Sequence, residues 1–84
     1  MTSSPQEIRN TVTQKIFDSL YIDEDDLFDG DTTDLRELGL DSIRLTRLLR
    51  DFGITPESKM LESIALNPSI DTITRAIYHH TFAE

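Results

Sequence analysis

Apolar residues recur every three or four positions over most of the chain, the period of an α-helix with one buried face. This pattern covers residues of about 5–20, 42–52, 57–65 and 69–81, and no alternating run predicts a strand. Residues 21–40 lack the pattern. The sequence therefore predicts an all-α fold, a small four-helix bundle with a long loop between helices 1 and 2, formed as a single domain over residues 1–84.

Local signals mark the ends of these helices. Ser4 precedes Pro5 and lies three residues before Glu7, which is the spacing of a capping box. Ser69 stands before the last helix as an expected cap, and Gly53 stands where the second helix should end. The expected core positions of the first and last helices are Ile8, Val12, Ile16, Leu20, Ile70, Ile73 and Ile77.

The segment 21–40 is rich in aspartate, and we expect it to be a loop. Its apolar residues are the expected anchors on the core: Leu27, Phe28, Leu35 and Leu38. A calcium loop with Gly30 at its sixth position would place Leu27 and Arg36 where oxygen ligands are needed. We therefore predict no metal site, and a calcium-binding module remains the weaker alternative.

Composition narrows the function further. Sixteen acidic residues against eight basic ones give a net charge of −8, which argues against nucleic-acid binding. The absence of cysteine excludes disulfides and thiol chemistry. The N-terminus does not read as a signal peptide, and no apolar run is long enough to span a membrane. We expect a soluble, cytoplasmic protein that is a monomer and does not bind membranes.

The stretch "LGLDSIRL" at residues 38–45 raises the question of what Ser42 does. Ser42 is a candidate helix cap, in which case its replacement by alanine would cost about 0.5–2 kcal/mol. A catalytic serine is disfavoured, because no Gly-x-Ser-x-Gly motif occurs and His79 and His80 lie near the C-terminus. The third interpretation is covalent attachment, since a helix N-terminus suits an added phosphate.

This stretch resembles the attachment motif of phosphopantetheine-dependent carrier proteins, and the resemblance extends over nearly the whole chain. "LNPSIDTI" at residues 66–73 resembles the start of the last helix in these proteins. Both stretches are most similar to peptidyl and aryl carriers of nonribosomal peptide synthesis. Fatty-acid carriers typically have an acidic second helix, whereas this one carries Arg44, Arg47 and Arg50.

The resemblance implies a role for several residues. Ser42 would hold a covalent 4′-phosphopantetheine cofactor, and Gly39, Leu40 and Asp41 would help a phosphopantetheinyl transferase to recognise it. The implied partner-binding residues are Ile43, Arg44, Thr46, Arg47, Met60, Leu61 and Ile64. Helical spacing also favours core packing for at least two of Met60, Leu61 and Ile64. The arginines form either a solvated face, paired with the acidic loop, or a code read by partners.

The resemblance further implies a freestanding carrier and not an enzyme. An adenylating enzyme would load an aminoacyl, aryl or acyl group as a thioester, and condensation or tailoring enzymes would take it off. The pathway would be nonribosomal peptide synthesis or related secondary metabolism, such as siderophore formation. The alternatives are a fatty-acid or polyketide acyl carrier and, outside the family, an acidic helical adaptor in which Ser42 is only a cap.

Overall fold

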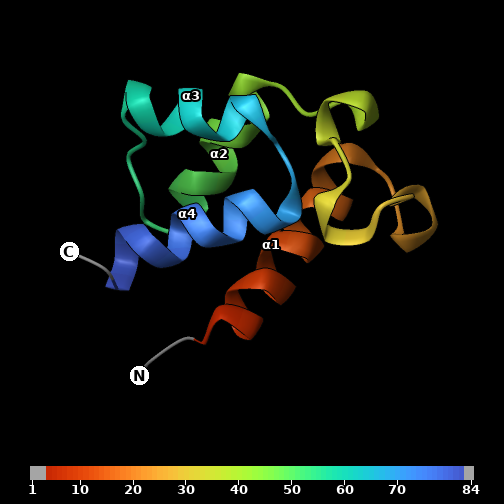
Figure 1. Ribbon diagram of the computed structural model, residues 1–84, viewed down its shortest axis with the longest axis horizontal. Helices are drawn as coiled ribbons and strands as arrows, with labels where there is room; N and C mark the ends of the chain where they lie inside the picture. The colour runs from red at the N-terminus through yellow and green to blue at the C-terminus, as the bar shows by residue number, and fades with distance from the viewer. Residues whose placement is uncertain (1–3, 83–84) are drawn as a thin grey trace.

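The computed structural model describes residues 4–82, and within them the chain forms four α-helices and no strand (Figure 1). The helices are α1 (Pro5–Leu20), α2 (Ser42–Asp51), α3 (Ser58–Leu66) and α4 (Ile70–Phe82). The most extensive helix–helix contact joins α1 and α4, while α2 packs against α1 and α3. The predicted all-α bundle is therefore confirmed. Over the same residues, no helix combines the length and the apolar character needed to cross a lipid bilayer.

The helix ends follow the local signals. The Glu7 backbone N–H donates to the Ser4 hydroxyl (3.2 Å), and the Thr72 N–H donates to the Ser69 hydroxyl (3.1 Å). Gly53 takes a φ of 78°, which lets the Ile54 N–H bond to a carbonyl in the last turn of α2. The expected caps at Ser4 and Ser69 and the stop at Gly53 are therefore confirmed.

One apolar core joins the four helices. Its buried side chains are Ile8, Val12, Ile16, Leu35, Leu40, Leu45, Leu48, Leu49, Ile54, Ile64, Ile70, Ile73 and Ile77. The molecule measures 34 × 27 × 19 Å, so its short axis is about two helix diameters. Because side chains fill this thin core, a binding site has to lie on the surface.

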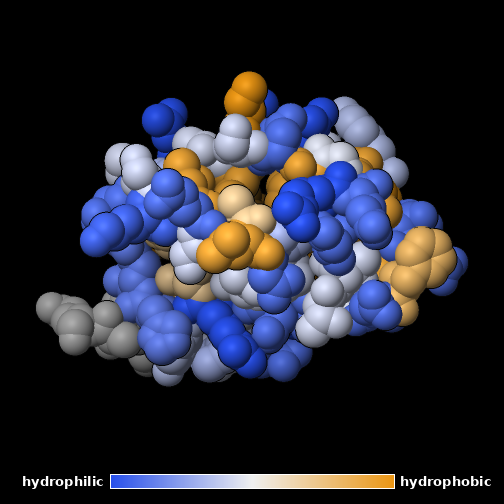
Figure 2. Space-filling view, turned by 45° about the horizontal axis from the view of Figure 1, so that its top comes forward, coloured by the Kyte–Doolittle hydropathy of each residue, from blue (hydrophilic) through white to orange (hydrophobic). Residues whose placement is uncertain are grey.

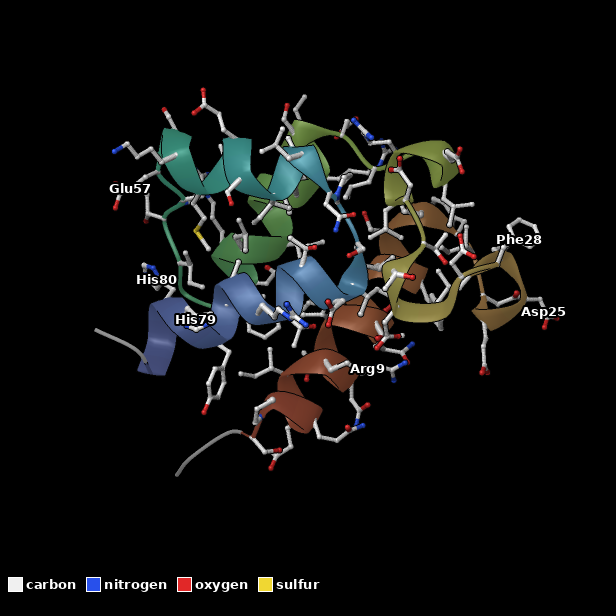
Figure 3. The ribbon with its side chains drawn as sticks, viewed as in Figure 1. Arg9, Asp25, Phe28, Glu57, His79 and His80 are labelled. Carbon is white, nitrogen blue, oxygen red and sulfur yellow. The ribbon has the colours of Figure 1, made fainter. Side chains whose placement is uncertain are left out.

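The segment between α1 and α2 is ordered into three short 3₁₀ helices: η1 (Glu24–Asp26), η2 (Gly30–Thr32) and η3 (Leu35–Leu38). Leu35 is fully buried, and Leu27 and Leu38 pack against the core as predicted. The prediction for Phe28 is wrong: its side chain is 86% exposed and points away from the helices (Figure 3). The turn closed by the Gly30 N–H on the Leu27 carbonyl directs Leu27 inward and its neighbour outward.

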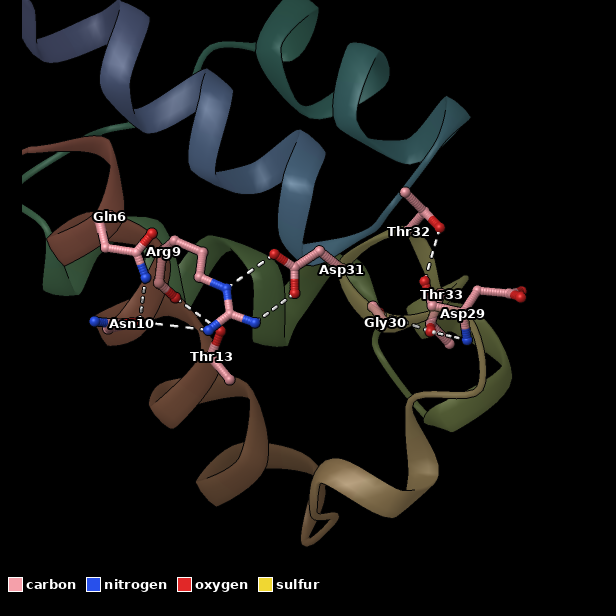
Figure 4. A network of polar contacts seen from close by, with 9 residues as sticks. All are labelled: Gln6, Arg9, Asn10, Thr13, Asp29, Gly30, Asp31, Thr32 and Thr33. Atoms are coloured by element: carbon pink, nitrogen blue, oxygen red, sulfur yellow. Dashed lines mark hydrogen bonds and ion pairs between the residues drawn. The ribbon is translucent and has the colours of Figure 1, made fainter.

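Two long-range contacts fasten this segment to the helices. The Arg9 guanidinium on α1 donates two hydrogen bonds to the Asp31 carboxylate, at 2.9 and 2.7 Å (Figure 4). These bonds hold the pKa of the Asp31 carboxyl below its usual value. The Leu35 N–H donates to the Pro68 carbonyl (2.8 Å), which joins η3 to the start of α4. The segment therefore has a defined position, and so does the turn that follows it.

Three acidic side chains of this segment accept a hydrogen bond from a backbone N–H of their own turn. The Asp25 N–H donates to the Asp23 carboxylate and the Asp23 N–H donates to the Asp26 carboxylate, both at 3.0 Å. Thr33, which is buried, bridges the next turn by accepting from the Asp29 N–H and donating to the Gly30 carbonyl. Among residues 4–82, no three His, Asp or Glu side chains converge in a way that would hold a metal ion.

Candidate functional site at the start of helix α2

The turn before α2 fixes where that helix begins. Gly39 ends η3 with a φ of 107°, a left-handed conformation that favours glycine. The Leu40 N–H then donates to the Leu35 carbonyl (3.0 Å), and the Leu40 side chain is buried in the core. Asp41 and Ser42 therefore follow directly from an anchored residue.

Asp41, and not Ser42, caps the helix. The Arg44 backbone N–H donates to one Asp41 carboxylate oxygen (2.8 Å), and the Arg44 guanidinium donates to the other (3.1 Å) and to the Gly39 carbonyl (3.4 Å). The interpretation of Ser42 as the cap is therefore wrong, because the capping role belongs to the residue before it. The Arg44 guanidinium therefore forms its ion pair with the capping residue Asp41. The sequence had offered, as one alternative, that the α2 arginines pair with the acidic side chains of segment 21–40, and Arg44 does not do so.

Ser42 is the first residue of α2, and its side chain is exposed. Its hydroxyl makes no hydrogen bond within the part of the chain that the structure describes. The backbone N–H groups of the first turn and the helix dipole create a positive potential there. The site thus offers a free hydroxyl at a rigid position that favours an attached anionic group.

An apolar hollow lies on one side of Ser42, between α2 and α3. Its volume is about 140 Å³, and it is lined by Arg36, Leu40, Asp41, Ser42, Leu45, Leu61, Ala65 and Pro68. The Arg36 guanidinium donates two hydrogen bonds to the Asp34 carboxylate. These hydrogen bonds lower the pKa of the Asp34 carboxyl. Figure 2 shows apolar side chains gathered at the centre of the face that includes α3, with hydrophilic ones around them.

A second depression, which we call the basic hollow, also reaches Ser42. It has a volume of about 370 Å³, and its lining residues are Ser42, Ile43, Thr46, Arg47, Arg50 and Leu61. The structure thus brings together Ser42 and four of the expected partner-binding residues. Arg50 completes the hollow. The sequence left open whether Arg50, like Arg44 and Arg47, belongs to a solvated face or to a surface read by partners.

The other expected contact residues lie elsewhere. Ile64 is 1% exposed, so the prediction that it contacts partners is wrong. Met60 lines, with Ile64, a separate hollow of about 520 Å³ between α3 and α4. The expectation that at least two of Met60, Leu61 and Ile64 pack on the core is confirmed, since Met60 and Leu61 are partly buried there.

Sequence reasoning missed Tyr21. This residue ends α1, is 93% exposed, and lines a fourth hollow together with Ile43, Arg44 and Arg47. One signal in the sequence could have identified it. An aromatic residue follows the last apolar position of the first helix, and glycine or asparagine is the usual residue where a helix ends in the left-handed conformation.

His79 and His80 do not take part in this site. Both line the hollow between α3 and α4, as does Glu57 near the start of α3 (Figure 3). Ser42 is not among the residues that line that hollow. A serine nucleophile needs a base within hydrogen-bond reach, and these are the only histidines of the chain. The arrangement suits a serine that is modified by another protein.

Comparison with known proteins gives one consistent result. The family model described as "Phosphopantetheine attachment site" matches residues 10–77. Acyl carrier proteins of Mycobacterium bovis and Mycobacterium tuberculosis are each 48% identical over 63 residues, which is 75% of this chain and 81% of the relative. The acyl carrier protein MmaB of Mycobacterium marinum is 47% identical over 64 residues, 76% of this chain and 77% of the relative. No solved structure matches at a significant level.

Proposed function

The chain belongs to the family of proteins with a phosphopantetheine attachment site, and we propose that Ser42 is the residue that carries the arm. Members of this family are carriers and not catalysts. The prosthetic group is a covalently attached 4′-phosphopantetheine, whose terminal thiol holds cargo as a thioester. The chain therefore works with a phosphopantetheinyl transferase and with partner enzymes that load and use the arm.

The free, exposed hydroxyl of Ser42 carries this proposal. Asp41 supplies the cap, so modification of Ser42 costs the helix no hydrogen bond. The first turn of α2 favours the negative charge of the phosphodiester that forms. Ser42 Oγ would bond to the phosphorus of the pantetheine arm as the pyrophosphate bond of coenzyme A breaks. Adenosine 3′,5′-bisphosphate would leave, and the serine proton would pass to a base of the transferase.

Intact-protein mass spectrometry tests this assignment. The chain is incubated with coenzyme A, magnesium and a promiscuous phosphopantetheinyl transferase. We expect the wild type to gain one arm and Ser42→Ala to gain none. Ser58→Ala is the matched control, because Ser58 is also an exposed first residue of a helix. Modification of a folded Ser42→Ala variant would refute the assignment.

For the cargo, we propose an aminoacyl, aryl or acyl group of a nonribosomal peptide or related pathway. Its support is the similarity of "LGLDSIRL" and "LNPSIDTI" to peptidyl and aryl carriers. An adenylating enzyme would form the thioester, and condensation or tailoring enzymes would remove it. The test is to screen adenylating enzymes for thioester formation on the arm-bearing chain. An arm-bearing chain that accepts cargo only from fatty-acid or polyketide enzymes would argue against this pathway.

A second candidate, a carrier of short acyl groups, is favoured by the apolar hollow beside Ser42. Its volume of about 140 Å³ is close to that of a protein cavity that binds benzene. A short acyl chain on the arm should therefore fold back into it and raise the Tm more than a polar aminoacyl group does. Ala65→Leu, which fills the hollow, should remove that difference. Equal Tm values for both cargoes on the wild type would exclude this candidate.

A further inference from the structure

We propose that the basic hollow docks an acidic segment that also carries an apolar side chain, on the phosphopantetheinyl transferase that modifies this chain. This inference rests on the proposed function, since it takes Ser42 as the residue that the transferase must reach. It assigns the docking role to Arg47 and Arg50 and not to Arg44. The sequence alone left open whether these arginines form a solvated face or a surface that partners contact.

The charge of the hollow is opposite to that of the molecule. The chain has a net charge of −8, yet the residues that line this hollow include two arginines and no acidic residue. Neither Arg47 nor Arg50 has an ion-pair partner among the described residues, and both are exposed. Interactions between exposed charges are screened beyond about 8 Å at physiological ionic strength. A docked protein therefore experiences mainly the charges at the hollow itself, and those of its lining residues are positive.

The hollow also has an apolar part. Ile43 is 71% exposed, and Leu61, which lines the hollow with it, is half-buried. Contact surfaces between proteins commonly have an apolar centre and a polar rim. Here Ile43 and Leu61 supply the apolar part of the lining, and Arg47 and Arg50 supply its charge. The complementary surface has carboxylates beside an apolar side chain.

Geometry favours the transferase as the occupant. An enzyme that acts on Ser42 Oγ must bring its active site to a hydroxyl that itself lines the hollow, so it must cover the hollow. Enzymes that act on the thiol meet the far end of the arm and are less restricted. Arg44 does not line this hollow, and its guanidinium is bonded to Asp41 and to the Gly39 carbonyl.

Transferase kinetics test the inference. The measured quantity is kcat/KM for arm transfer from coenzyme A, at low and at high ionic strength. We expect Arg47→Glu and Arg50→Glu each to lower kcat/KM about tenfold at low ionic strength, and to remove its decrease with salt. Arg75 pairs with Asp71 at 3.4 Å, so the fold of Arg75→Glu is checked first by circular dichroism. This variant is the control, since it makes the same charge change at an exposed position of α4 outside the hollow. It should behave as the wild type.

A second variant covers the case in which Arg47→Glu does not fold. Arg47→Gln removes the charge without reversing it, and its kcat/KM should lie between those of the wild type and of a charge-reversed variant. Charge-reversed variants that are folded and modified as fast as the wild type, or faster, would overturn the inference and leave the proposed function intact. A wild type that two unrelated transferases fail to modify would overturn both.

Discussion

Asp41 and Ser42 are adjacent, but they have separate roles at the start of α2. Asp41 accepts the Arg44 N–H, whereas the Ser42 hydroxyl makes no hydrogen bond within the described residues. We expect Asp41→Ala to lower the free energy of unfolding by about 1 kcal/mol, the usual cost of a lost cap. Ser42→Ala should change it by less than about 0.5 kcal/mol, as for other exposed positions. Urea unfolding of both variants measures the difference.

Asp41→Asn is the control for this pair, because asparagine caps helices about as well as aspartate. It should keep most of the stability that Asp41→Ala loses. A Ser42→Ala variant that lost as much stability as Asp41→Ala would contradict the observed cap. It would return Ser42 to the capping role that its sequence position suggests.

Tyr21 has a backbone conformation that does not suit tyrosine. Its φ and ψ are 56° and 44°, in the left-handed region, and its side chain is 93% exposed and gains little from burial. This region costs ordinary residues roughly 1–2 kcal/mol, whereas asparagine tolerates it. Tyr21→Asn should therefore raise the Tm, measured by thermal unfolding. Tyr21→Phe keeps the unfavourable conformation and should leave the Tm unchanged; an equal rise in both variants would refute this explanation.

At the residue scale, the signals that worked are those contained within a few positions. The caps at Ser4 and Ser69 and the stop at Gly53 each depend on neighbours in the same turn. The choice between Asp41 and Ser42 as cap was not decidable in this way, since both residue types cap helices equally well. Ile64 was misplaced as a contact because the sequence does not tell which side of a short helix meets the core.

At the scale of elements, the ion pair of Arg9 and Asp31 connects α1 to the segment before α2. About a third of each side chain is exposed, so the pair should contribute no more than about 1 kcal/mol. The Arg9 hydrogen bonds lower the pKa of Asp31 in the folded chain. The contribution is therefore present above the unfolded carboxyl pKa of about 3.9 and is lost as the pH falls through the lower, folded value.

Arg9→Gln tests this linkage. Its unfolding free energy should lie below that of the wild type by a constant amount near neutral pH, and the gap should close in acid. Urea unfolding at a series of pH values measures the gap. Arg47→Gln removes one positive charge that has no ion-pair partner among the described residues, so it controls for charge alone. A gap between Arg9→Gln and the wild type that persisted unchanged in strong acid would show that the ion pair does not cause it.

The segment 21–40 shows why sequence reasoning stopped at a loop. Arg9 and Asp31 are 22 residues apart, and the Leu35 N–H finds its acceptor at Pro68. Neither contact has a local signal, so the positions of η1 and η2 were not predictable. Leu35 and Leu38 were foreseen as anchors because they are apolar residues in a polar segment. The free hydroxyl at Ser42 was foreseen through a family motif, whereas the basic hollow required the packing of α2 against α3.

On the scale of the whole molecule, the proposed site lies on the surface because the core is too thin to enclose one. The short axis of 19 Å leaves room for two layers of helices. Specificity must then come from the exposed side chains around Ser42, and the charge distribution becomes decisive. The acidic residues concentrate in the segment between α1 and α2, while the basic hollow lies on α2 and α3.

The net charge of −8 should also limit the stability of the whole chain, because like charges repel in the compact state. Asp25 is exposed and its carboxylate makes no hydrogen bond among the described residues. Asp25→Asn should therefore raise the Tm at low ionic strength, and by less at high ionic strength, where salt screens the repulsion. Asp26→Ala removes the same charge but also the acceptor for the Asp23 N–H, so it should lower the Tm. Thermal unfolding over a salt series distinguishes the two effects, and an Asp25→Asn gain that did not shrink with salt would show that repulsion is not its cause.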